Sequence, residues 1–143
     1  MSVFEYNFEQ YKSLSPDLYR KEKYNLQVEL LKLQEDVIKK KRKIAICFEG
    51  RDTAGKSSTI NFFSEHLIPS NFNYVHLGIP TKKERKNWFE RYETYLPNKG
   101  QIVLFDRSWY TRALTEPTLG YCSKIQYEEF MTKVNKWEKS LVK

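Results

Sequence analysis

One stretch of the sequence decides the fold: Ile44-Ala45-Ile46-Cys47-Phe48-Glu49-Gly50-Arg51-Asp52-Thr53-Ala54-Gly55-Lys56-Ser57. It opens with a continuous apolar run, which is typical of a buried strand in a parallel sheet. Residues 50–57 then fit G-x-x-x-x-G-K-[ST], the P-loop pattern, in which backbone N–H groups and a lysine surround phosphate oxygens. Residues 57–67 place Ile60, Phe63 and Leu67 on one helical face, so the strand–loop–helix order that this pattern requires is present.

The loop residues are the candidates for binding phosphate. Glycine lets the backbone turn its N–H groups toward a phosphate oxygen, and a helix N-terminus adds partial positive charge. Lys56 supplies a mobile charge for the outer phosphates, and the Ser57 hydroxyl is placed to reach Mg²⁺. The predicted phosphate-binding residues are Gly50, Arg51, Thr53, Ala54, Gly55, Lys56, Ser57 and Ser58.

Acidic residues in two places indicate a metal site. A carboxylate within a phosphate loop repels its ligand unless a cation lies between them, so we expect Asp52 to hold Mg²⁺; an Asx-type cap of the loop is the alternative. Ile102-Val103-Leu104-Phe105-Asp106 is an apolar strand that ends in an acid, the Walker B arrangement. We predict Asp52, Asp106 and Ser57 as metal ligands and expect Arg107 to reach phosphate from the same edge.

Apolar periodicity indicates that strands alternate with helices along the rest of the chain. Leu26, Leu30, Leu33 and Val37 recur at spacings of three and four, which predicts an amphipathic helix. We expect helices over 21–40, 57–67, 82–96 and 125–141, strands over 44–49, 74–77 and 102–106, and a turn at Ser15-Pro16. This alternation predicts the α/β class, a parallel sheet with helices on both faces.

The composition excludes several classes of protein. The 143 residues carry 25 Lys+Arg against 18 Asp+Glu, and the net charge of +7 favours polyanionic ligands. Aromatic residues make up 15%, which is too many for a disordered chain. The two cysteines are far apart, and no signal peptide or membrane-spanning run is readable, so we expect a cytoplasmic protein.

Other conspicuous residues receive simpler interpretations. We expect structural roles for His66 and His76 and a buried position for Cys47. Trp88, Tyr92 and Tyr95 are predicted to pack in the core. A basic set is interpreted as an electrostatic track for a phosphate chain, namely Lys82, Lys83, Arg85, Lys86 and Arg91.

Together these motifs resemble the polyphosphate kinase 2 family over roughly residues 20–143. The matching segments are 49–56, Pro80-Thr81, Trp88 through Tyr92, Leu96-Pro97, 105–112, Glu116 and Gly120-Tyr121. The resemblance implies a P-loop kinase fold and Mg²⁺-dependent phosphoryl transfer between inorganic polyphosphate and a nucleotide, ADP, GDP or AMP. It implies Asp52, Lys56, Asp106 and Arg107 as catalytic residues, with Arg112 and Glu116 as catalytic supports. Residues 1–20 are then an N-terminal arm and 21–143 a P-loop kinase domain.

Two departures from the family pattern shape the expectation. Ser57-Ser58 stands where the family commonly has two small glycines. The family's later strands and basic lid have no readable counterpart, so the fold is expected to be incomplete at the C-terminus and to associate with itself or with a C-terminal half. There are two alternative functions: an ATP-dependent nucleoside-monophosphate kinase, and a non-catalytic module that binds phosphate or nucleic acid. We expect no membrane as a partner, and nucleic acid is disfavoured as a partner of the kinase.

Overall fold

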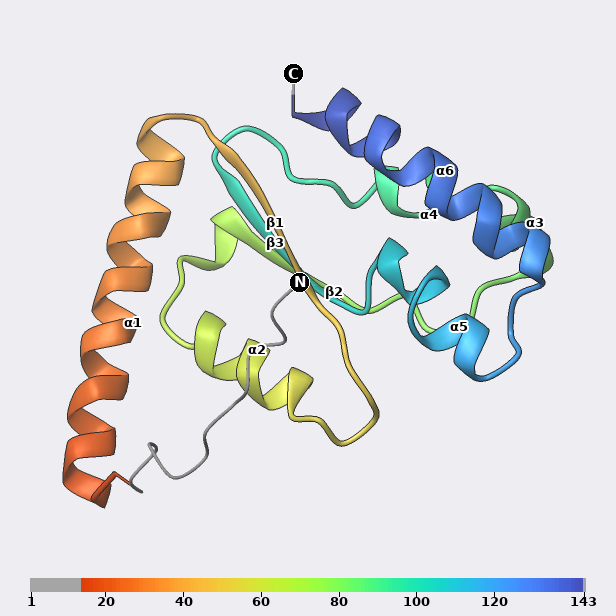
Figure 1. Ribbon diagram of the computed structural model, residues 1–143. Coiled ribbons are helices and arrows are strands. Elements are labelled where there is room, and N and C mark those ends of the chain that lie inside the picture. The colour runs from red at the N-terminus through yellow and green to blue at the C-terminus, as the bar shows by residue number, and fades with distance from the viewer. Residues whose placement is uncertain (1–13, 143) are drawn as a thin grey trace, which may run out of the picture.

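Figure 1 shows the computed structural model of the chain, which describes residues 14–142. A three-stranded sheet lies at its centre, built from β1 (Lys43–Phe48), β2 (Phe72–Val75) and β3 (Gln101–Asp106). The strand order is β1-β3-β2, and both pairs are parallel. Because the register sets Phe48 opposite Asp106, the loops that follow β1 and β3 leave the sheet at the same edge.

Helices cover both faces of this sheet. In Figure 1, α1 (Pro16–Lys39) and α2 (Lys56–Ser64) lie on one side, and α3 (Lys82–Lys86), α4 (Glu90–Glu93), α5 (Thr115–Thr118) and α6 (Lys124–Leu141) lie on the other. Two short 3-10 turns, η2 (Pro69–Asn71) and η3 (Trp109–Arg112), complete the elements of residues 14–142. The predicted α/β class, a parallel sheet flanked by helices, is confirmed.

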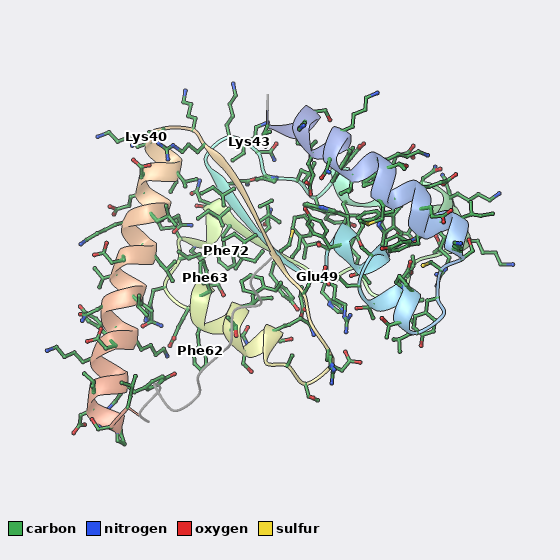
Figure 2. The ribbon with its side chains drawn as sticks, viewed as in Figure 1. Lys40, Lys43, Glu49, Phe62, Phe63 and Phe72 are labelled. Carbon is green, nitrogen blue, oxygen red and sulfur yellow. The ribbon has the colours of Figure 1, made fainter. Side chains whose placement is uncertain are left out.

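The middle strand explains why the sheet has two cores. Side chains alternate between the faces of a strand, so β3 sends Ile102 and Leu104 to one face and Val103 and Phe105 to the other. The first pair packs with Val37 of α1 and other apolar residues, among them Ile60, Phe63 and Phe72; Figure 2 shows Phe63 and Phe72 between the sheet and α2. The second pair packs against an aromatic cluster that includes Trp88, Tyr92, Trp109 and Phe130.

The first helix differs from its prediction in two ways. Ser15-Pro16 does not form a free turn, because Ser15 caps the helix through the Leu18 N–H and Pro16 opens it. Helix α1 therefore includes residues 16–20 of the predicted arm, and residues 1–13 lie outside the described range. The expected apolar face is also only partly buried: Val37 is enclosed, but Leu26 is 65% exposed.

A polar contact explains which face of α1 turns inward. Gln34 is fully buried, and its amide donates to the Ile68 carbonyl at 3.0 Å and accepts from the Ile68 N–H at 2.6 Å. The segment after α2 thus obtains backbone partners from a side chain of α1. None of the helices within residues 14–142 has the length and apolar composition needed to cross a membrane.

The predicted helix over 82–96 is wrong in its continuity. The structure has two short helices instead, α3 and α4, because Asn87 leaves the helical region with φ −107° and ψ 58°. The break turns Trp88 and Tyr92 into the core, as predicted, while Tyr95 remains 45% exposed. The turns η2 and η3 and helix α5 were not readable from periodicity, since each spans only three or four residues.

Candidate active site

The loop between β1 and α2 has the conformation of a phosphate cradle. Gly50 and Gly55 adopt φ of 142° and 85°, values that side-chain-bearing residues rarely reach, and Gly55 is the N-cap of α2. The Lys56 ammonium folds back on the loop and donates to the Gly50 carbonyl at 3.2 Å and the Arg51 carbonyl at 2.8 Å. The lysine charge thus rests at the mouth of the loop, on weak neutral acceptors that a phosphate can replace.

A cavity of about 330 Å³ lies directly over this loop. Six of the predicted phosphate-binding residues line this cavity, namely Thr53, Ala54, Gly55, Lys56, Ser57 and Ser58. The lining is completed by Asp52 of the same loop and by three residues at or just after the ends of β2 and β3, namely His76, Asp106 and Arg107. The structure therefore brings the loop, Asp106 and Arg107 together as predicted. Gly50 and Arg51 contribute through the carbonyls that hold Lys56.

Asp106, at the end of β3, is the most enclosed carboxylate of this cavity, with 4% of the residue exposed. Its Oδ2 accepts from the Ser57 hydroxyl at 3.0 Å and from the Tyr74 hydroxyl at 3.0 Å. Burial and the bond to Asp106 raise the pKa of Tyr74, which keeps that hydroxyl protonated as a donor. Sequence reasoning missed Tyr74, because nothing in the local pattern of β2 indicates that this hydroxyl contacts the end of β3.

His76 also belongs to this site, which corrects the structural role expected for it. Its Nδ1 lies 3.8 Å from Asp106 Oδ2, and its side chain is 48% exposed. The residue follows the end of β2, and the ends of parallel strands converge at one edge of a sheet. That position was the available signal, although the boundary predicted for β2 placed His76 inside the strand.

Arg107 connects the two acidic positions. Its guanidinium bonds Asp52 Oδ1 at 2.6 Å and the Thr115 hydroxyl at 3.0 Å. Its backbone adopts φ 65°, a left-handed conformation that strains a residue with a side chain. The pair leaves Asp52 largely in solvent, with 91% of its side chain exposed, so the carboxylate is accessible to a cation as well as to Arg107.

Glu49 stabilises this strained turn from the end of β1. Its Oε1 accepts from the Ser108 N–H at 2.6 Å and from the Ser108 hydroxyl at 2.8 Å, and Ser108 is fully buried. Figure 2 shows Glu49 at the end of β1, where the P-loop begins. The Arg107 N–H donates to the Phe48 carbonyl at 3.0 Å, so the turn is fixed on both sides of Arg107. Glu49 therefore orients Arg107 but does not line the 330 Å³ cavity over the P-loop, which we call the phosphate cavity.

A second and larger cavity, of about 480 Å³, adjoins the first. The two share four lining residues, Asp52, His76, Asp106 and Arg107. The larger cavity extends from these residues between the loop after β2 and the segment around α5; its further lining includes Leu77, Ile79, Trp88, Thr111, Glu116, Leu119 and Tyr121. Two spaces of ligand size thus meet at one group of charged side chains.

Arg112 and Glu116 lie deeper than the phosphate cavity. Arg112 Nε lies 2.6 Å from Glu116 Oε2, both side chains are almost fully buried, and the guanidinium stacks 4.0 Å from the Trp88 ring centroid. Arg85 reaches the same carboxylate at 3.2 Å. Glu116 lines the larger cavity, whereas the structure places Arg112 behind it. Their role as supports of catalysis stays a prediction.

The basic track predicted over 82–91 is only partly basic surface. The Arg91 guanidinium is buried, and it donates to the Leu77 carbonyl at 2.9 Å and the Gly78 carbonyl at 2.8 Å. Arg85 is occupied by Glu116 and by the Tyr121 carbonyl. These two arginines hold loops in place, while Lys82, Lys83 and Lys86 remain exposed.

The oxygen groups of the site fit a hard divalent cation. Among residues 14–142, no three His, Cys, Asp or Glu side chains gather closely enough to hold a metal by themselves. Mg²⁺ commonly binds one or two carboxylates and completes its shell with water and substrate phosphates. Asp106, Ser57 and the exposed Asp52 offer that kind of partial shell beside a phosphate cavity.

Comparison with known proteins places the chain in a family. The sequence model for polyphosphate kinase 2 (PPK2) matches residues 13–143, nearly the whole chain. The chain belongs to the polyphosphate kinase 2 family. Its fold is also that of the family: it superposes on the crystal structure of polyphosphate kinase 2 from Arthrobacter aurescens TC1 with a TM-score of 0.81 at 18% identity, covering 99% of this chain and 54% of that one.

Curated members of the PPK2 family are similar in sequence. A GDP-polyphosphate phosphotransferase of Pseudomonas aeruginosa is 46% identical over 86% of this chain and 35% of its own length. An ADP-polyphosphate phosphotransferase of the same organism is 44% identical over 91% of this chain and 43% of its own length. The chain thus spans less than half the length of these relatives.

Proposed function

We propose that this chain binds inorganic polyphosphate and a nucleotide and takes part in Mg²⁺-dependent phosphoryl transfer between them. The observation that carries the proposal is the pair of adjoining cavities that share Asp52, His76, Asp106 and Arg107. Phosphoryl transfer requires a donor and an acceptor to be aligned across one cluster of compensating charge. The names of the relatives, GDP- and ADP-polyphosphate phosphotransferases, support these two substrates.

The P-loop is suited to hold the phosphates at one end of the reaction path. Lys56 can leave the Gly50 and Arg51 carbonyls, because a phosphate oxygen is a stronger acceptor for an ammonium group. The N-terminus of α2, capped by Gly55, directs free N–H groups toward the same oxygens. Both effects favour the anionic ligand over water.

Arg107 is suited to compensate charge where the cavities meet. Its guanidinium is held in place by Thr115, and its backbone by Glu49 through Ser108. A fixed cation of this kind stabilises a transferring phosphoryl group without reorganising during the reaction. The phosphate oxygens of a nucleotide are already anionic at neutral pH, so alignment replaces a strong general base.

The metal belongs to the same proposal. Asp106, Ser57 and Asp52 would hold Mg²⁺, which, when bound, supplies Lewis-acid charge neutralisation to the phosphates. Ser57 and Tyr74 donate to Asp106 Oδ2, so this carboxylate is kept oriented toward the cavity. Two free cysteines, Cys47 and Cys122, support the cytoplasmic location that we propose.

Incubation of the purified chain with Mg²⁺, polyphosphate and ADP, GDP or AMP tests the proposal. We expect the chain to bind polyphosphate and any product nucleotide to depend on polyphosphate as donor. Little product is expected with ATP as donor and AMP as acceptor, which is the reaction of the alternative kinase. Lys56→Ala, which removes the loop charge, is the matched negative control. Binding of polyphosphate with no Mg²⁺-dependent turnover would contradict catalysis by this chain and favour the non-catalytic binding module.

Light scattering on the same sample tests the predicted association of the chain with a second copy of itself. Within residues 14–142, the outer edges of β1 and β2 have no neighbouring strand. Such edges present free N–H and C=O groups, which supports that association. A mass of one chain at the concentrations of the assay would contradict self-association.

A further inference from the structure

Three large apolar side chains stand exposed at the mouth of the 480 Å³ cavity. Ile79 is 88% exposed, Leu119 54% and Tyr121 60%, and all three line that cavity. They come from two separate segments, since Ile79 follows β2 and the other two follow α5. Apolar groups gathered in solvent around one opening are typical of a surface that is covered when a ligand binds.

The backbone on the β2 side of this mouth is fixed by a buried arginine. Arg91 donates to the carbonyls of Leu77 and Gly78, the two residues that precede Ile79. Only 3% of the Arg91 side chain is exposed, and its Nε lies 3.3 Å from Glu84 Oε1. The position from which Ile79 projects is therefore set before any ligand arrives.

The backbone on the α5 side is fixed in the same way. The Tyr121 N–H donates to the Glu116 carbonyl at 2.8 Å, and the Tyr121 carbonyl accepts from Arg85 at 2.7 Å. Both backbone groups of Tyr121 are thus engaged, while its ring remains in solvent. Exposed apolar side chains on immobilised backbones form a preorganised surface, which lowers the entropy cost of binding.

Polarity changes along the cavity in the order that a nucleotide requires. Asp52, Asp106 and Arg107 line both cavities, whereas Ile79, Leu119 and Tyr121 line the larger cavity alone. A ligand with phosphates at one end and a flat, weakly polar ring at the other matches this gradient. A second inorganic phosphate chain does not, because it has nothing to place on Ile79, Leu119 or Tyr121.

We infer that Ile79, Leu119 and Tyr121 form a nucleobase clamp, in which the base stacks on the Tyr121 ring and contacts the two aliphatic side chains. The clamp rests on the proposed function, because the clamp assigns the larger cavity to the nucleotide and the phosphate cavity to polyphosphate. Arg85 and Glu116 at the cavity wall are paired with each other, so they hold the clamp in place instead of reading the base.

Calorimetric titration of the full chain with ADP and with tripolyphosphate tests the clamp. Tyr121→Ala should weaken ADP binding about fivefold to a hundredfold, the range for loss of one base-stacking ring. Tyr121→Phe keeps the ring and should restore the affinity. Tripolyphosphate affinity should be unchanged in both variants, because that ligand has no base.

Met131→Ala is the matched control, since Met131 is 48% exposed on α6 and lines none of the cavities described. Its ADP affinity should equal that of the wild type. Equal ADP affinity in Tyr121→Ala and in the wild type would overturn the clamp alone. A wild-type chain that binds tripolyphosphate but no ADP would overturn the clamp together with the proposed nucleotide site.

Discussion

The Arg107 guanidinium lies 2.6 Å from Asp52 Oδ1 and joins the P-loop to the turn after β3. The contact is unequal, since 23% of the Arg107 side chain is exposed against 91% of the Asp52 side chain. Arg107 is fixed by Thr115 and by its own strained backbone, whereas Asp52 sits on an open loop. Asp52 is therefore the partner that can turn toward a bound cation, and Arg107 the partner that stays.

Asp52→Asn should separate catalysis from folding. If Asp52 positions Mg²⁺, the variant should lose at least about 100-fold in turnover, which corresponds to about 3 kcal/mol of transition-state stabilisation. The melting temperature should hardly change, because the side chain is exposed and asparagine can still cap the loop. Steady-state kinetics and thermal denaturation measure the two effects.

Asp17→Asn makes the same change in charge at an equally exposed side chain on α1. It should affect neither quantity. A near-normal rate in Asp52→Asn, together with a clearly lower melting temperature, would favour the capping role instead.

Lys56→Ala should weaken phosphate binding while the fold survives. Among the described residues, the ammonium donates hydrogen bonds only to the carbonyls of Gly50 and Arg51. The exposed loop therefore loses no buried partner, and the loop glycines remain. Titration with tripolyphosphate checks the affinity, with Lys99→Ala as the control for lost charge. Lys99 is exposed just before β3 begins, at the end of the sheet opposite the P-loop. Equal affinity in the wild type and in Lys56→Ala would mean that this loop does not hold the polymer.

Glu49→Ala should destabilise the turn that presents Arg107. The substitution removes the acceptor of two hydrogen bonds from the buried Ser108, and a bond to a charged group contributes about 1.5–3 kcal/mol. We expect urea denaturation to show a loss of about 2–3 kcal/mol, with a smaller loss in Glu49→Gln, which keeps one acceptor oxygen. Glu90→Ala, at an exposed position of α4, is the control. An unchanged free energy of unfolding in Glu49→Ala would contradict the role of Glu49 in stabilising the turn at Ser108.

Cys47 should react slowly with a thiol reagent at pH 8. Burial raises the pKa of the Cys47 thiol to about 11, so almost none of it is thiolate at that pH. Because the pKa is raised, the rate should grow about 100-fold between pH 8 and pH 10, far more than for an unperturbed thiol. The measurement uses Cys122→Ser, so that Cys47 is the thiol observed. Cys47 is partly buried, not fully buried as predicted. A rate that levels off below pH 9 would contradict a thiol that is kept protonated by this partial burial.

Local sequence pattern was sufficient to predict the elements that build the candidate phosphate site. The P-loop and the strand ending at Asp106 each combine an apolar run with polar residues at its end, and such patterns are read within about a dozen residues. The same kind of reasoning failed for α1, because a run of leucines with helical spacing does not say which face meets the sheet. The buried amide of Gln34 decides that face, through a partner 34 residues away.

Sequence reasoning missed two site residues because their contacts are also distant in sequence. Tyr74 and His76 reach Asp106 across 32 and 30 residues of sequence, so neither contact leaves a local signature. Arg91 was interpreted as part of a basic track because it closes a basic set that starts just after the carboxyl end of the second strand. The break at Asn87 instead turns its side chain into the core. Charge composition alone does not distinguish a cation in solvent from one that satisfies buried carbonyls.

Arg91→Met separates these two interpretations of Arg91. The substitution keeps apolar bulk but leaves the Leu77 and Gly78 carbonyls without their donor, and removing one partner from buried charged bonds costs about 3 kcal/mol or more. We therefore expect a lower free energy of unfolding in urea and weaker ADP binding, because Ile79 loses its fixed position. Lys82→Ala and Lys83→Ala, at exposed positions of α3, should change stability by less than about 0.5 kcal/mol. Unchanged stability in Arg91→Met, with tripolyphosphate affinity lost, would instead return Arg91 to the phosphate track.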